Sequence, residues 1–388
     1  MPYTSLRAER ELALQIALGV PLSAVRGFAS PEAGSLYARA RELCQQVGET
    51  PELFRVLRGL WEFYELRAEY RMAFELAEEL LALAERLQGR ALLLIAHHAL
   101  GDTSFWVGDF PAARAHLEQG FRLYDVEEHR SHAFLHGYDT GVACLCFGAN
   151  ALWFLGYPDQ ALRRVGEALT LARGLDHAFS LVLALFFSAL LHHFRRECQA
   201  VRDQVAEALR ISTEQSFGFW LGYAAIIQGW ALAEAGQAQE GLTQIRQGIA
   251  DSRAAGQELE MPHSLGLLAE AHGRANQPEE GLDVLTEALT IVERTGERFW
   301  EAELHRVYGE LSLRVAAPAT RDSAVLVSAE ESFRKAIEIA RRQQAKSLEL
   351  RAVMSLSCLL KKQARMKKLA RSSPRSTAGS PRGSKRRT

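Results

Sequence analysis

Three histidines have the spacing in this chain that comes nearest to a metal site. His129, His132 and His136 stand three and four residues apart, so on a helix they would share one face. A zinc site also needs a fourth ligand and a fixed second shell, for which Glu127 and Glu128 are neighbouring candidates. We interpret the segment more simply as a semi-exposed connecting helix or loop, and we predict no bound metal and no cofactor.

The same segment is a candidate contact surface. It belongs to an insertion, residues 126–140, and insertions in repeat proteins often lie on the binding face. The candidate partner contacts are His129, Arg130, His132, His136 and Tyr138. A metal or small-molecule site at these histidines stays open as a further hypothesis, which stoichiometric zinc binding would favour.

Motifs for catalysis are missing from the sequence. It contains no Gly-x-x-x-x-Gly-Lys-Ser/Thr phosphate loop, no Gly-x-Ser-x-Gly elbow and no His-Glu-x-x-His helix. Paired carboxylates such as Glu78–Glu79 and Glu279–Glu280 are expected on solvated faces, whereas a general acid needs a dry pocket. We therefore predict no enzymatic activity and assign no catalytic or cofactor-binding residue.

The cysteines and the longest apolar stretch indicate the compartment. The five cysteines are odd in number and irregular in spacing, which favours buried reduced thiols and a cytoplasmic location. The uncharged stretch Ala178–Leu191 has fourteen residues, whereas a membrane span needs about 20. We interpret this stretch as the buried inner helix of one repeat and predict no membrane partner.

Small residues recur through the chain with a period of about 40. The first series steps by 48 once and then by 40, at Gly101, Ala149, Ala189, Gly229, Ala269 and Gly309. A second series lies twelve residues after the first, at Ala113, Ala161, Val201, Gly241 and Gly281. This period is typical of stacked helical hairpins, in which small residues let helix A and helix B of one unit approach closely. We predict an all-α, right-handed solenoid of roughly seven helix–turn–helix units over residues 1–362.

Individual stretches resemble known repeat families. Leu100-Gly101, Gly108-Asp109-Phe110 and Ala113 follow the spacing of the tetratricopeptide repeat, and the longer period is similar to that of MalT-like regulators. Residues 155–162 (LGYPDQAL) and 295–304 (TGERFWEAEL) resemble the C-terminal repeat region of large bacterial signalling proteins. Those proteins join a class III adenylate/guanylate cyclase domain, or another effector, to an NTPase domain and then to such repeats.

The resemblance implies a scaffold whose partners in the family are the upstream NTPase and cyclase domains. This chain starts where the repeats start, so the catalysis of the family cannot be assigned to any residue here. We predict a non-enzymatic scaffold for protein–protein interaction or regulation, a fragment of a cyclase/ATPase signalling protein. Its protein or peptide partner is expected in the concave groove, where some of the helix-A aromatics should lie.

The last residues differ from the rest in charge. Residues 361–388 hold eleven Lys or Arg and no acid, which leaves 35 basic against 47 acidic residues in 1–360. We predict that residues 363–388 form a basic disordered tail. One interpretation is an arm for nucleic acid, which gives the alternative function of a nucleic-acid-associated regulator. The other is a single-base frameshift, because one base inserted after the codon of Gln363 can restore a family-like ending, Tyr-Gly-Trp-Phe-Thr-Glu-Gly-Phe.

Overall fold

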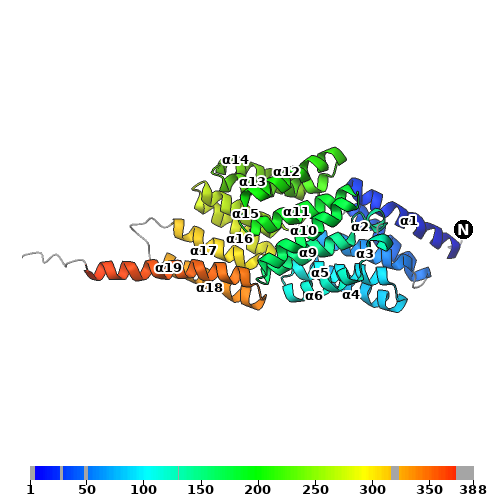
Figure 1. Cartoon of the computed structure of the whole chain (residues 1–388), viewed down its shortest axis with the longest axis horizontal. Coiled ribbons are helices and arrows are strands. Elements are labelled where there is room, and N and C mark those ends of the chain that lie inside the picture. Colours follow the sequence, from blue (N-terminus) through cyan, green and yellow to red (C-terminus); the bar gives the residue numbers. More distant parts are fainter. Residues whose placement is uncertain (1–4, 27–28, 48–50, 130, 316–322, 373–388) are drawn as a thin grey trace, which may run out of the picture.

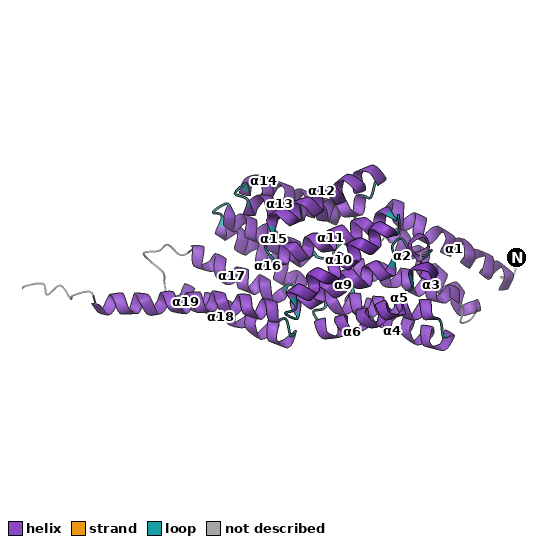
Figure 2. Ribbon diagram, in the orientation of Figure 1, coloured by secondary structure: helices purple, strands orange, loops and turns teal. Residues whose placement is uncertain are grey.

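The computed structural model describes residues 5–26, 29–47, 51–129, 131–315 and 323–372. These residues form helices and no strand (Figure 2). The helices are α1 (Ser5–Arg26), α2 (Pro31–Val47), α3 (Pro51–Leu66), α4 (Tyr70–Leu87), α5 (Arg90–Trp106), α6 (Phe110–Leu123), α7 (Val126–His129), α8 (His132–His136), α9 (Thr140–Phe154), α10 (Pro158–Gly174), α11 (Ala178–Phe194), α12 (Cys198–Gln215), α13 (Gly218–Glu234), α14 (Ala238–Ala254), α15 (Met261–Arg274), α16 (Pro278–Thr295), α17 (Glu301–Val315), α18 (Ser323–Arg342) and α19 (Lys346–Ser372).

Consecutive long helices pack in pairs, and the pairs stack into an elongated solenoid (Figure 1). The pairs that carry the 40-residue period are α3/α4, α5/α6, α9/α10, α11/α12, α13/α14, α15/α16 and α17/α18. The short helices α7 and α8 form the insertion between α6 and α9. The chain is therefore an all-α solenoid of tetratricopeptide-like units, as the sequence predicted.

Tight turns separate the two helices of each unit. Gly108, Gly156 and Gly236 have φ angles of 83°, 90° and 91°, respectively. Each therefore ends a helix A in the left-handed region. Asn276 does the same without being a glycine, with φ of 59°. Pro158 begins α10 at a position where a missing N–H costs no hydrogen bond.

The small residues of both series are buried between helices. A Cβ added at Gly229 would lie 2.7 Å from the carbonyl oxygen of Gly241, and one at Gly248 would lie 2.6 Å from that of Gly222. Ala189 is completely buried as well. Backbone-to-backbone contact of this kind leaves no room for larger side chains, so it sets how closely α13 and α14 pack.

Successive turns of the superhelix touch along one edge. The carbonyl oxygen of Leu66 accepts hydrogen bonds from the backbone N–H groups of Glu258 and Leu259, at 3.1 and 3.2 Å. The carbonyl oxygen of Trp106 accepts one from the N–H of Phe299 at 3.1 Å. Leu259 and Phe299 each lie 193 residues after their acceptor, so the two contacts repeat in register. This closure encloses side chains that an open solenoid would leave in a groove.

The last helix contradicts the predicted boundary of the tail. Because α19 runs to Ser372, residues 363–372 are helical where the sequence analysis expected disorder. The cause is local, since 364–371 consists mostly of strong helix formers and the breaker Pro374 comes later. Residues 373–388 lie outside the described residues. Toward its end α19 extends beyond the stacked helices, and Leu350 and Met354 on it are about 60% exposed.

Two structural observations bear on the predictions about membrane spans and buried cysteines. No helix in the described part of the chain is long and apolar enough to cross a membrane. Cys44, Cys144 and Cys146 are buried, Cys198 is half-buried and Cys358 is exposed. Cys358 departs from the predicted burial because it lies on a face of α19 that no other described helix covers.

Candidate functional site

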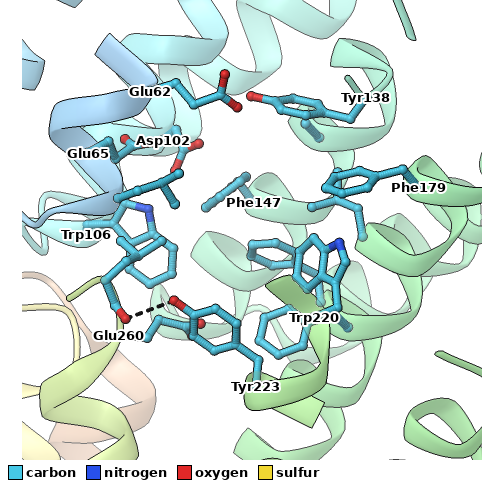
Figure 3. A pocket seen from close by; sticks show the side chains of 16 residues that line it. Glu62, Glu65, Asp102, Trp106, Tyr138, Phe147, Phe179, Trp220, Tyr223 and Glu260 are labelled. Atoms are coloured by element: carbon cyan, nitrogen blue, oxygen red, sulfur yellow. Dashed lines mark hydrogen bonds between the residues drawn. The ribbon is translucent and has the colours of Figure 1, made fainter. Parts of the chain in front are cut away.

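A pocket lies among the helices A of five units (Figure 3). It encloses about 650 Å³ of unfilled space, including the part that is open to solvent. Side chains from α3, α5, α9, α11 and α13 form it, together with the turns that lead into α9 and α15. Its lining residues are Glu62, Glu65, Leu66, Asp102, Trp106, Tyr138, Ala143, Phe147, Phe179, Leu183, Phe186, Phe187, Trp220, Tyr223, Leu259 and Glu260.

Aromatic rings form one wall of the pocket. The ring centroids of Trp106 and Phe147 lie 5.8 Å apart, edge to face. Phe186 packs against Trp220 and Tyr223, with centroid distances of 5.1 and 5.5 Å. Such a wall is apolar but presents electron-rich ring faces, so it suits an aliphatic chain or an organic cation.

Four buried carboxyl groups lie at or beside the pocket, and we name them the acidic cluster. They are Glu65, Asp102, Glu260 and Glu297. Each is at most 4% exposed, and the first three line the pocket. Figure 3 shows Glu65 and Asp102 close together on neighbouring helices, with Glu260 reaching the pocket from the turn before α15.

Protein donors satisfy part of the acidic cluster. Thr103 Oγ1 donates a hydrogen bond to Glu65 Oε1 at 3.0 Å. The hydroxyl of Tyr70 and the backbone N–H of Glu260 both donate to Glu297 Oε2, at 2.7 and 3.1 Å. Glu297 thus connects the start of α4 to the turn before α15, and it lies where two superhelical turns meet.

Two carboxyl oxygens in the pocket have no hydrogen-bond donor of normal geometry among the described residues. They are Asp102 Oδ1 and Glu260 Oε1. The Trp106 indole is near enough to act against the rise in the pKa of Asp102 that burial causes. The nearest imidazole nitrogens, on His98 and His263, are 3.8 and 3.9 Å from the two carboxyl groups. Burial lowers the pKa of both histidines to about 3, so neither supplies a positive charge.

Among the described residues, the acidic cluster has no neutralising cation. Burial raises the pKa of Glu65, Asp102 and Glu260 well above the usual range, and that of Glu297 to about 8. Neighbouring acids add to the rise, since Asp102 acts on Glu65 and Glu297 acts on Glu260. Within the described part of the chain, no Lys or Arg forms an ion pair with any of the four. They therefore hold protons where exposed carboxyl groups would be ionised.

Arg58 is a cation at the rim of the pocket, but its guanidinium group already has partners within the chain. Arg58 Nη1 donates to Glu62 Oε2 at 3.3 Å, and the guanidinium lies 5.3 Å from the ring centroid of Tyr138. Arg58 Nη2 also donates to the carbonyl oxygen of His136 at 3.1 Å. Glu62, Tyr138 and Phe179 are half-buried, so they mark the side from which solvent reaches the pocket. Tyr138 is thus one predicted contact residue that the structure places at this site.

A second buried charged group lies among α15, α17, α19 and the end of α11, and we name it the arginine cluster. It consists of Arg196, Arg306 and Arg351 with Glu270 and Glu303. Arg196 binds both oxygens of Glu270, and the fully buried Glu303 accepts from Arg306 and Arg351 at 2.8 and 3.0 Å. Although burial alone would raise them, these arginines lower the pKa values of Glu270 and Glu303 to about 2.

The other predicted contact residues do not gather at the pocket. His129 is buried in α7, where its Nδ1 lies 2.9 Å from both the backbone N and O of Asp125. His136 is buried at the end of α8. Arg130 and the side chain of His132 lie outside the described residues. In the ranges that the structure describes, no three His, Cys, Asp or Glu side chains are arranged to hold a metal ion.

Sequence reasoning missed the acidic cluster because it expected carboxylates on solvated faces. One sequence position could have predicted buried polar residues. It is the position directly after Trp61 and directly after each small residue of the first series. These residues are Glu62, Asp102, Asn150, Leu190, Trp230, Glu270 and Glu310. None of them is exposed, and they include members of both charged clusters. Glu260 and Glu297 have no such signal, because they lie in turns and reach the cluster only through superhelical closure.

Comparison with known proteins finds a relative that this chain matches over only part of its length. No family model matches the chain. An uncharacterized protein of Rhizobium meliloti (strain 1021) is 25% identical over 343 residues. The match covers 88% of this chain and 32% of the relative, so the chain spans about a third of the length of the curated protein it matches.

Solved structures share the fold at low sequence identity. A Rap protein complexed with Competence and Sporulation Factor has a TM-score of 0.55 at 12% identity, covering 92% of this chain and 99% of that one. NprR in complex with its cognate peptide NprX has a TM-score of 0.51 at 13% identity, covering 91% and 99%. At these identities the likeness shows a common helical-repeat fold.

Proposed function

We propose that this chain is a non-enzymatic scaffold that binds a peptide or protein segment on the inner face of its superhelix. The pocket would anchor one side chain of that partner. The observation that carries the proposal is a pre-formed pocket with an aromatic wall and buried carboxyl oxygens that lack donors. Buried polar groups are normally satisfied within the protein, so unsatisfied ones lining a cavity favour a ligand.

The structural neighbours support a peptide as the first partner class to test. NprR was solved with its cognate peptide NprX, and the Rap protein with Competence and Sporulation Factor. Their likeness to this chain is one of fold, and the same fold can serve different ligands. The extended inner surface of helical-repeat proteins nevertheless suits a linear segment, which makes the analogy physically reasonable.

We further propose that the chain works as the repeat region of a longer signalling protein. The resemblance of residues 155–162 and 295–304 to repeat regions behind NTPase and cyclase domains supports this, as does a curated relative about three times as long. In that setting the upstream domains would be regulated by what the repeats bind. The alternative of a nucleic-acid-associated regulator rests on the basic residues 361–388 and stays a sequence prediction.

Selection of linear peptides from a random library against the purified chain tests the scaffold proposal. A photo-cross-linking amino acid placed at Phe179, on the pocket rim, should capture the selected peptides. The matched control is the same amino acid at Tyr157, which is 43% exposed in the turn between α9 and α10 and does not line the pocket. Failure to select any peptide, or capture only from position 157, would contradict binding at the inner face.

A further inference from the structure

The acidic cluster contains more buried carboxyl groups than the described residues neutralise. Arg58 is engaged by Glu62, and the two nearby imidazoles are neutral. Asp102 Oδ1 and Glu260 Oε1 line an aromatic cavity without a donor of normal geometry. We propose that this pocket binds the ammonium group of a lysine side chain from the bound segment. The inference rests on the proposed scaffold function and specifies the chemistry of its anchor.

Asp102 is the expected primary acceptor. It is 4% exposed, and its Oδ1 lacks a donor of normal geometry among the described residues. A side-chain hydrogen bond between Glu65 and Asp102 adds to the rise that burial causes in the pKa of Glu65 and opposes the rise in that of Asp102, so Asp102 is the one of the two that gives up its proton more readily. Glu260 contributes a second acceptor oxygen from the turn before α15, near enough that Asp102 acts on its pKa. An ammonium in low dielectric interacts far more strongly with carboxylates than it would in water.

The shape of the site favours lysine over arginine. The neighbouring acceptors Glu65 and Asp102 come from separate helices, α3 and α5, and an ammonium offers three rotatable donors to such a set. Guanidinium groups match one carboxylate with two parallel bonds, which is what Arg196 does with Glu270 in the arginine cluster. The aromatic wall, with Phe147 and Phe186, suits the four-carbon stem of lysine.

Binding should exchange a proton for the ligand's charge. In the empty pocket the carboxyl groups are held protonated by burial. When a lysine ammonium enters, one carboxylic acid loses its proton to the buffer and becomes the carboxylate that accepts the ammonium. The pocket therefore gains one positive and one negative charge and stays neutral overall, and the released proton can be measured.

The probes are Nα-acetyl-lysine methylamide and its norleucine analogue, which has an unbranched chain without the ammonium. Binding to the full chain is measured by ligand-observed NMR, and proton release by calorimetry in buffers of different ionisation enthalpy. The lysine probe should bind at least about tenfold more tightly than the norleucine probe and release a proton.

Asp102→Asn should lower lysine affinity by about tenfold or more, and Glu260→Gln by less. Glu279→Gln, on an exposed face of α16, is the matched control and should change nothing.

Three results would overturn the inference. Equal binding of the lysine and norleucine probes would show that the pocket takes an apolar chain. Tighter binding of Nα-acetyl-arginine methylamide would assign the pocket to a guanidinium, and binding of cadaverine without the lysine probe would assign it to a small amine. Each variant must retain the wild-type melting temperature at pH 6, and Glu65→Gln provides a second pocket variant if Asp102→Asn fails to fold.

The scaffold proposal and the lysine inference can fail separately. Selected peptides that cross-link at Phe179 but tolerate norleucine at every lysine would keep the scaffold and reject the lysine anchor. Specific binding of the lysine probe with no selectable peptide would keep the cation site and reject the peptide scaffold.

Discussion

The acidic cluster and the arginine cluster both contain buried carboxyl groups, but the pKa values of these groups are shifted in opposite directions. In the arginine cluster each carboxylate has a guanidinium partner, and the pKa values of Glu270 and Glu303 are lowered to about 2. In the acidic cluster no such partner exists among the described residues, and the pKa of Glu297 is raised to about 8. Guanidinium groups of the chain neutralise the carboxylates of the arginine cluster. The carboxyl groups of the acidic cluster are neutralised only by protons or by a bound cation.

This difference separates a structural role from a binding role. The arginine cluster ties α19 to the body, because Arg351 reaches Glu303 on α17 and the carbonyl oxygen of Phe194 at the end of α11. The acidic cluster joins superhelical turns only through neutral hydrogen-bonded groups and leaves oxygens unsatisfied beside a cavity. Variants that remove one charge should therefore affect the two clusters unequally.

Glu303→Gln should give the largest effect. It removes the fully buried carboxylate that Arg196, Arg306 and Arg351 share, and breaking a buried pair costs about 3–5 kcal/mol. Urea denaturation at pH 7 measures the loss. Glu310→Gln is the control, because Glu310 also binds Arg306 but its side chain is 39% exposed, so it should cost less than about 1 kcal/mol. Equal costs for both variants would remove the structural role from the arginine cluster.

Ala189→Leu tests the scaffold that connects the clusters. Ala189 is completely buried in α11, which carries Phe186 in the pocket and ends next to Arg196. Overpacking there should destabilise the chain by about 1–3 kcal/mol or more and lower its melting temperature. An unchanged melting temperature would show that the 40-residue register does not report helix contacts.

Glu65→Gln should have little effect on stability, in contrast to Glu303→Gln. Because Glu65 is held protonated, an amide of the same shape replaces a neutral group and can still accept from Thr103. We expect a change below about 1 kcal/mol at pH 6, measured by urea denaturation. A loss as large as that of Glu303→Gln would mean that Glu65 is ionised and neutralised by a group not identified here.

Deletion of residues 364–388 should give the smallest effect. Among the α19 side chains whose burial is described, which end at Arg365, the last buried one is Leu359, and the arginine cluster uses Arg351, so both precede the deletion. We expect the melting temperature and both clusters to be unchanged. Destabilisation would show that the end of α19 or the following residues pack on the body.

The repeating helix pairs of this molecule could be predicted from the sequence, whereas the acidic cluster could be predicted only to a small extent. The small residues at Gly229 and Gly241 imply close helix pairs, because local spacing alone determines which faces touch. Asp102 could have been placed on the inner face from its position after Gly101. Glu297 could not, since its burial depends on contact with Tyr70, 227 residues earlier, which no local pattern encodes.

The pH dependence of stability in Glu297→Gln tests most directly the claim that the acidic cluster is buried without a cation. Because folding raises the pKa of Glu297 from 4.5 to about 8, its contribution is fully present below pH 4.5 and is lost as pH rises toward 8. The buried histidines, such as His98 and His263, titrate in the opposite sense, so the quantity to follow is the difference between variant and wild type.

The free energies of unfolding of Glu297→Gln and wild type should differ by less than about 1 kcal/mol at pH 5 and should diverge as pH rises. At pH 8 the variant should be the more stable by a few kcal/mol, about 5 at most. A difference that stays constant between pH 5 and 8, or that favours the wild type at pH 8, would show that Glu297 is ionised and paired, and would contradict the account.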